Sequence, residues 1–176
     1  MKSNAVYFGG SRHPHNTNPA QIAAVVAAVV ASGSRVHVGC QFGADAQVIT
    51  AYLHTTAPCS NLNLFAVSHI APQWFHTPAI LGASVTLSAG GTTAPIHARY
   101  LLRSIAAFQG CSQAVFFAPG AGSLAVAREC VRSGLPVFAF GAQPARVSSV
   151  SGQWVASSFM GFECWSWVAP VQLSIF

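Results

Sequence analysis

Short apolar segments alternate with helix-like segments along most of the chain, and this alternation limits the possible folds more than any other feature. Residues 5–8, 35–38, 62–67, 85–88, 114–118 and 137–140 have the apolar character of buried strands. Composition and apolar spacing predict helices over residues 20–31, 43–54, 96–108 and 124–133. Strands that alternate with helices form a parallel sheet covered by helices on both faces. We therefore predict an α/β, Rossmann-like fold.

The chain shows no linker, repeat or low-complexity tract, so residues 1–176 are predicted to form a single domain. Its Rossmann-like core covers about residues 5–141. The aromatic-rich remainder, about 143–176, is predicted to be a C-terminal hairpin with Gly161 at or near its turn. Residues 68–82 contain Pro72 and Pro78, which indicates a loop with at most one helical turn.

Composition excludes several classes of protein. The chain is 52% hydrophobic and 6% charged, whereas disordered chains are poor in apolar residues and rich in charge. The most apolar stretch, residues 22–31, is shorter than the roughly 20 residues that cross a bilayer. There is also no secretory signal, so we expect a cytoplasmic protein without a membrane partner. Few surface charges favour a homo-oligomer, which would cover apolar surface.

The charged and metal-ligating residues favour an anionic ligand over a metal. The chain has three acids against eight Lys and Arg, a formal net charge of +5, and seven of the eight are Arg, which suits bidentate phosphate contacts. This modest charge allows a nucleic-acid partner without requiring one. The five cysteines form no Cys-x-x-Cys pair, so we expect reduced thiols and no metal site.

Four glycine-containing loops follow predicted strands. They are Gly9-Gly10-Ser11-Arg12, the segment from Gly39 to Gly43-Ala44-Asp45, Gly90-Gly91-Thr92-Thr93, and Pro119-Gly120-Ala121-Gly122-Ser123. Ligands of parallel sheets bind beyond the carboxyl ends of the strands, near the point where the strand order reverses. Glycine lets the backbone approach an anion, and a helix that begins there directs its free N–H groups toward the anion.

These loops predict one shared anion site, although each loop alone could be an ordinary tight turn. Arg99 and Arg103, one helical turn apart, could add charge nearby. The predicted ligand-binding residues are Gly9, Gly10, Ser11, Arg12, Gly39, Gly43, Ala44, Asp45, Gly90, Gly91, Thr92, Arg99, Pro119, Gly120, Ala121, Gly122 and Ser123.

Several of the polar and aromatic residues have more than one interpretation. Asp45 could cap the helix that it begins, or it could bind a ribose hydroxyl or orient the loop, and the capping and functional roles are compatible. His13 and His15 fit a solvated loop or a ligand contact better than a metal site, and His37 fits the core. The tryptophans at 154, 165 and 167 could stack on bases, but such residues in a terminal hairpin more often cover a core or an oligomer interface.

Taken together, the loops resemble the SLOG superfamily, which unites DNA-processing protein A with the cytokinin-activating LOG proteins. The similar segments are Gly10-Ser11-Arg12, Gly39-x-x-x-Gly43-Ala44-Asp45, Pro119-Gly120-Ala121-Gly122-Ser123 and the helix with Arg99 and Arg103. The resemblance covers about residues 5–141. It implies a Rossmann-like sheet that binds nucleotides or nucleic acid at these loops.

The chain departs from the catalytic motif of the LOG proteins, Pro-Gly-Gly-x-Gly-Thr-x-x-Glu. After Gly122-Ser123 come Leu124, Ala125 and Val126, so the position of the catalytic glutamate is apolar. Glu129, one helical turn further on, is the remaining weak catalytic candidate, and the resemblance does not imply an enzyme. DNA-processing protein A, by contrast, binds single-stranded DNA and helps to load a recombinase.

Three functional hypotheses follow. The first is a sensor or carrier that binds a nucleotide or nucleotide derivative; beyond this phosphate-bearing ligand the sequence indicates no particular cofactor. The alternative is a single-stranded DNA-binding protein like DNA-processing protein A. The second alternative is a LOG-like nucleoside monophosphate phosphoribohydrolase that uses Glu129, and the scarcity of acids makes it the weakest of the three.

Overall fold

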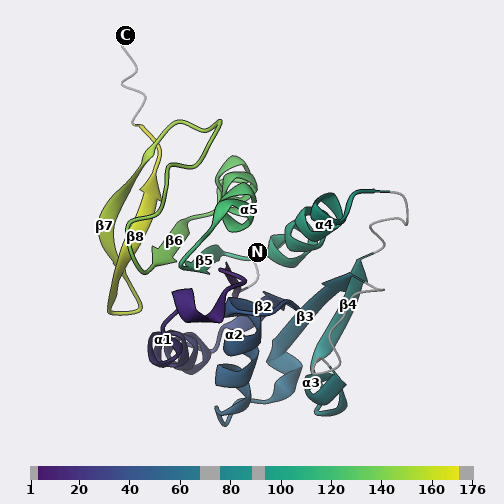
Figure 1. Ribbon diagram of the computed structural model, residues 1–176. Helices are drawn as coiled ribbons and strands as arrows, with labels where there is room; N and C mark the ends of the chain where they lie inside the picture. Colours follow the sequence, from purple (N-terminus) through teal and green to yellow (C-terminus); the bar gives the residue numbers. More distant parts are fainter. Residues whose placement is uncertain (1–3, 68–75, 89–93, 171–176) are drawn as a thin grey trace.

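A computed structural model describes residues 4–67, 76–88 and 94–170. In these residues one eight-stranded sheet contains all the strands, in the order β4-β3-β2-β1-β5-β6-β8-β7 (Figure 1). The strands are β1 (Ala5–Gly10), β2 (Arg35–Gly39), β3 (Leu62–Val67), β4 (Ser84–Ser88), β5 (Gln113–Phe117), β6 (Val137–Phe140), β7 (Gln153–Phe159) and β8 (Phe162–Val168).

The first six strands are parallel, as the alternating pattern predicts. β1 lies between β2 and β5, and Phe8 pairs with Val38 on one side and with Val115 on the other. The chain adds strands outward from β1 to β4 and then returns across the sheet to place β5 on the other side of β1. The order therefore reverses between β1 and β5, which is where α/β proteins bind ligands.

Helices cover both faces of the sheet, and this prediction is confirmed. The helices are α1 (Pro19–Ala31), α2 (Ala44–Leu53), α3 (His76–Ile80), α4 (Ile96–Phe108) and α5 (Ala121–Arg132). Residues of α1 and α2, including Val25 and Tyr52, share one core cluster with Val6 and Phe8 of β1. Residues of α4 and α5, including Ala107 and Ala127, form the other cluster with Tyr7 of the same strand. Alternate residues of β1 thus face opposite helical layers.

Local sequence accounts for where the helices begin. α1 has Pro19 in its first turn, and the Asn18 side chain accepts hydrogen bonds from the backbone N–H groups of Ala20 and Gln21 at 3.1 and 3.2 Å. The helix predicted over 124–133 begins earlier, at Ala121, because its N-terminal residues are small and only its later turns have apolar periodicity.

The predicted C-terminal hairpin is present and joins the sheet. β7 and β8 pair antiparallel, and β8 pairs antiparallel with β6. The turn lies at Met160 and Gly161, both with positive φ. Trp154 and Trp167 are buried against the α4–α5 side of the sheet with their rings nearly perpendicular, so they cover the core. Because β7 runs parallel to β6, residues 141–152 cross from one end of the sheet to the other without a helix.

The sequence also led us to expect no membrane-spanning helix, reduced cysteines and no metal site. No helix in the described ranges is both long and apolar enough to span a bilayer. The five cysteines are all free, and Cys59 alone among them is not fully buried. Among the residues that the structure places, no three potential metal ligands come together.

Candidate functional site

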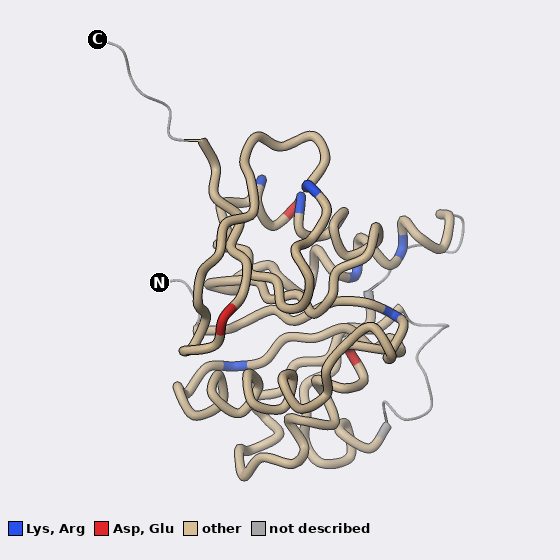
Figure 2. The backbone as a smooth tube through the Cα atoms, turned by 60° about the vertical axis from the view of Figure 1, so that its left-hand side comes forward, with Lys and Arg blue, Asp and Glu red and all other residues tan. Residues whose placement is uncertain are grey.

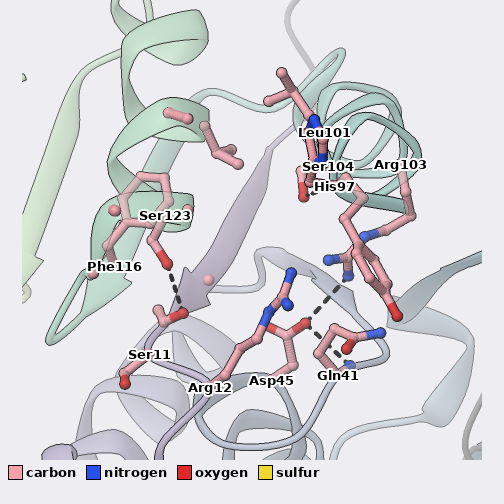
Figure 3. A pocket seen from close by; sticks show the side chains of 18 of the residues that line it. Ser11, Arg12, Gln41, Asp45, His97, Leu101, Arg103, Ser104, Phe116 and Ser123 are labelled. Carbon is pink, nitrogen blue, oxygen red and sulfur yellow. Dashed lines mark hydrogen bonds and ion pairs between the residues drawn. The ribbon is translucent and has the colours of Figure 1, made fainter. Parts of the chain in front are cut away.

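A cavity of about 550 Å³ opens at the reversal point of the sheet, between α4 and α5 (Figure 3). The loop after β1, the loop after β2 and the first turns of α5 line it together with one side of α4. Three of the four predicted glycine loops therefore meet at one site. The fourth, with Gly90, Gly91 and Thr92, lies outside the described residues.

The first turn of α5 faces this cavity without a side-chain cap. Gly120 is the N-cap residue, and no side chain of the described residues accepts a hydrogen bond from the backbone of the first turn. The first backbone N–H groups of a helix have no partner within the helix, and they carry its positive dipole end. Ala118, just before this turn, has a φ of 44°, which is uncommon for a residue other than glycine. The backbone is thus strained at Ala118, immediately before the helix whose N-terminus lies at the cavity.

Gly120 and Gly122 have open space where a Cβ would project, and neither has a positive φ. Nothing in the described packing or backbone requires glycine at these two positions. Because both line the cavity, an added methyl group would occupy space that a ligand could fill beside the N–H groups of α5. This pair differs from the glycines that the fold itself requires.

Three other predicted glycines are required by close packing. A Cβ at Gly10 would overlap the carbonyl oxygen of Phe117, and one at Gly43, where φ is 78°, would overlap the backbone of Ser11 and Arg12. A Cβ at Gly39 would overlap the side chains of Arg103 and Asp45. These glycines hold the loops together, and the absence of their side chains shapes the wall of the site.

Arg12 contributes an exposed positive charge at the rim of the cavity. Its guanidinium carbon lies 4.7 Å from the centre of the Tyr100 ring of α4, a cation–π contact of about 0.5–1 kcal/mol at an exposed site. Arg12 forms no ion pair with any described residue. Its charge acts on Asp45 from a distance and helps to lower the pKa of that carboxyl, but no contact ion pair with a described residue occupies the guanidinium, so it can also bind an anion.

Asp45 and Arg103 form a buried ion pair at the base of the cavity (Figure 3). Nη1 of Arg103 lies 3.2 Å from Oδ2 of Asp45, which also accepts a hydrogen bond from the backbone N–H of Gln41 at 3.2 Å. Burial raises the pKa of the Asp45 carboxyl, and the Arg103 guanidinium opposes that rise. Nε of Arg103 is buried with no partner among the described residues. The site thus contains one N–H donor of Arg103 without a hydrogen-bond partner among the described residues, next to the Asp45 carboxylate that Arg103 neutralises.

Two serines of the predicted site hold its loops in place. The Ser123 hydroxyl donates to the carbonyl oxygen of Gly10 at 2.6 Å, which joins α5 to the end of β1 (Figure 3). The Ser11 hydroxyl oxygen accepts hydrogen bonds from the His13 backbone N–H at 3.1 Å and from the Asn16 amide at 3.4 Å. Both side chains therefore take part in hydrogen bonds that hold the loops of the site together.

The structure brings together a part of the predicted set. The predicted residues that line the cavity are Gly9, Gly10, Ser11, Arg12, Asp45, Gly120, Ala121, Gly122 and Ser123. Those described but outside the lining are Gly39, Gly43, Ala44, Arg99 and Pro119. Arg99 is half-buried on α4, with Nε shielded and without a partner in the described ranges.

Glu129 does not lie at the cavity. Its Oε1 accepts hydrogen bonds from Nε of Arg128 at 2.8 Å and from Nη1 of Arg132 at 3.1 Å, beyond the first turns of α5. Val126, an apolar residue one turn before Glu129, lines the cavity instead. Of the described residues that line it, Asp45 is the only carboxylate, and it is already paired with Arg103.

From α4 the sequence predicted only arginines at the site, and it missed the other side chains with which this helix forms a wall of the cavity. His97, Tyr100, Leu101 and Ser104 line the cavity at helical spacings of three and four residues, so they occupy one side of the helix. That spacing is visible in the sequence, but a helix that only packs against a core shows the same spacing, so it does not identify a cavity wall. Tyr7 and Phe116 complete the floor from adjacent strands. Burial raises the pKa of the Tyr7 phenol, so this hydroxyl remains a hydrogen-bond donor.

The comparison with solved structures supports the fold. No family model matches the chain, and no curated protein matches it. Two solved structures have a similar fold. DNA processing protein A from Helicobacter pylori, described with a unique single-stranded DNA binding mode, is 15% identical, with a TM-score of 0.59 over 83% of this chain and 68% of that one. DNA processing protein A from Streptococcus pneumoniae is 17% identical, with a TM-score of 0.60 over 84% of this chain. The present chain spans only 53% of the Streptococcus protein.

Proposed function

We propose that this chain binds single-stranded DNA, with one phosphate of the strand held in the cavity between α4 and α5. The main support is the uncapped first turn of α5, where Gly120 and Gly122 leave the backbone N–H groups accessible. Such a helix terminus binds phosphate through its N–H groups and its dipole. The guanidinium of Arg12 on the opposite rim, which forms no ion pair with a described residue, adds a full positive charge.

Aromatic side chains beside this phosphate site favour a polymer with bases. Phe42 is 65% exposed at the cavity, and the Tyr100 ring lies near Arg12. Bases of single strands stack on such rings for about 1–3 kcal/mol each. The similarity in fold to DNA processing protein A of Helicobacter pylori, whose structure concerns single-stranded DNA binding, supports the same ligand class.

A nucleotide or nucleotide derivative is the second candidate ligand, favoured by the size of the cavity. A volume of about 550 Å³ falls within the range of about 300–1,000 Å³ that is usual for small-molecule sites. A sensor or carrier would use the same phosphate contacts. For this second function, the protein must recognise the base of a single nucleotide, without contacts to neighbouring nucleotides of a DNA strand.

Fluorescence anisotropy with a labelled oligothymidylate, competed by thymidine monophosphate, adenosine monophosphate and unlabelled oligonucleotide, separates the two. We expect the oligonucleotide to bind far more tightly than either mononucleotide, with strong salt dependence because each phosphate contact releases counterions. Equal affinity for a mononucleotide would favour the nucleotide-binding function. If neither class competes or binds, both functions are wrong.

A further inference from the structure

Arginine is distributed unevenly between the two helical layers. α1 has no charged residue, and the only one in α2 is the buried Asp45. Figure 2 shows most of the basic positions on the side of the sheet opposite to α1 and α2. Five of the seven arginines belong to that side, on α4, α5 and the crossing segment 141–152: Arg99, Arg103, Arg128, Arg132 and Arg146.

The side of α5 that lines the cavity continues to two of these arginines. Ala121 and Ala125 line the cavity, and Arg128 and Arg132 follow them at spacings of three and four residues. Residues at this spacing lie on one side of a helix. A rise of 1.5 Å per residue places Arg132 about 16 Å along the axis from Ala121. A ligand that leaves the cavity along α5 therefore meets both guanidiniums.

Glu129 holds the two guanidiniums together without cancelling their charge. Its carboxylate binds Arg128 and Arg132 at 2.8 and 3.1 Å. One carboxylate against two arginines leaves a net positive charge. The two arginine side chains are 26% and 48% exposed, and each guanidinium has five N–H donors, so donors remain available to solvent.

The crossing segment adds a third arginine on the same face. Val147 belongs to the same apolar cluster as Cys130 of α5, and its neighbour Arg146 is exposed. Figure 1 shows the segment between β6 and β7 passing beside α5. Arg146 and Trp167 line a hollow of about 420 Å³. The Trp167 Nε1–H is buried without an acceptor among the described residues.

We propose that Arg128, Arg132 and Arg146 form a second phosphate-binding region, which binds the continuation of a single strand whose first phosphate lies in the cavity. This inference rests on the proposed function. Phosphates advance by about 3.4 Å per nucleotide along a stacked strand, so the roughly 16 Å along α5 corresponds to about five nucleotides. A short oligonucleotide fills the cavity alone, whereas a longer one reaches both regions.

The test compares oligothymidylates of about 4 and about 16 nucleotides, the span of typical single-strand sites, by fluorescence anisotropy at several salt concentrations. The variants are Arg128→Gln/Arg132→Gln, Arg146→Gln and the control Arg35→Gln. Arg35 is exposed at the start of β2, at the end of the sheet away from the cavity. Circular dichroism and thermal melting establish that each variant is folded.

We expect the double variant to bind the short oligonucleotide as the unsubstituted protein does and to bind the long one several-fold more weakly. Its salt slope for the long strand should fall by about 0.7 for each phosphate that the variant no longer binds. Glu129→Gln, which removes the opposing charge, should strengthen long-strand binding. Unchanged affinity and slope of the double and Arg146 variants for the long strand would overturn the second region while leaving the cavity intact. Failure of the unsubstituted protein to bind either length would instead overturn the proposed function.

Discussion

The guanidinium of Arg103 and the carboxylate of Asp45 meet 3.2 Å apart above Gly39, and they connect the two helical layers across the end of the sheet. Arg103 belongs to α4 and Asp45 to α2, which cover opposite faces. Both side chains are more than nine-tenths buried. The pair therefore fixes the distance between the layers at the point where the cavity opens.

Replacing Arg103 with Leu should destabilise the protein by about 3–5 kcal/mol, because Asp45 would remain as a buried charge without its partner. The measurement is urea unfolding followed by circular dichroism. The double variant Arg103→Leu/Asp45→Asn should recover much of this stability, because no unpaired charge remains. Equal destabilisation in the single and double variants would show that packing, rather than charge, dominates at this pair.

Gly39→Ala should also destabilise the protein, because its Cβ would displace the Arg103 and Asp45 side chains. We expect a destabilisation comparable to breaking the pair, on the order of 3 kcal/mol. The same urea titration measures it. In the Arg103→Leu/Asp45→Asn background the cost should shrink, and an undiminished cost there would mean that Gly39 has another role.

Gly122→Ala should separate stability from binding. Alanine within a helix is up to about 1 kcal/mol more favourable than glycine, and the site of the new methyl group is open. The variant should melt at the same or a higher temperature and yet bind oligothymidylate more weakly, because the methyl group occupies the approach to α5. A variant that binds as tightly as the parent protein would place the phosphate elsewhere.

Arg12→Ala should weaken binding at least several-fold without unfolding the protein. Its contact with Tyr100 is worth only about 0.5–1 kcal/mol, whereas its charge is available to the ligand. The salt slope for a single strand should fall by about 0.7 if the variant binds one phosphate fewer. Arg35→Ala, which removes the same charge at the other end of the sheet, is the matched control and should change neither quantity.

His37 should make stability depend on pH near neutrality. Burial lowers the pKa of His37, and Nδ1 lies 2.8 Å from the carbonyl oxygen of Ala107. A group whose pKa is lower in the folded state contributes fully above its unfolded pKa of about 6.5, and this contribution decreases as the pH falls through that value. His37→Gln, which keeps a donor for Ala107, should reduce the stability difference between pH 7.5 and pH 5.5 in urea titrations. An identical difference in both proteins would exclude His37 as its source.

Sequence periodicity predicted the sheet and both helical layers because burial on two faces leaves a strong pattern in the strands. The early start of α5 was missed because its first turn, Ala121-Gly122-Ser123, has no apolar side that would mark a helix. The way in which the C-terminal hairpin joins β6 was also not predictable, since strand alternation does not specify the neighbour.

The loops of the site were predictable from glycine, but the role of each glycine was not. Gly39 and Gly122 look alike in the sequence, yet one is surrounded by an ion pair and the other by open space. Asp45 was interpreted as a cap, a ribose ligand or a residue that orients its loop; it accepts a hydrogen bond from the loop residue Gln41, and its ion-pair partner lies 58 residues away on α4. Such long-range pairing leaves no local signal, because it depends on how two helices meet across the sheet.

The uneven placement of arginine between the two layers also gives the molecule an electric dipole across the sheet. A strand of DNA that approaches from solution would experience a torque between the molecules before any contact forms, and the α4–α5 side would turn toward it. Complexes steered in this way form quickly at low ionic strength and more slowly as salt screens the field. The arrangement of charges in this fold thus influences how often an encounter is productive, independently of how tightly the final complex holds.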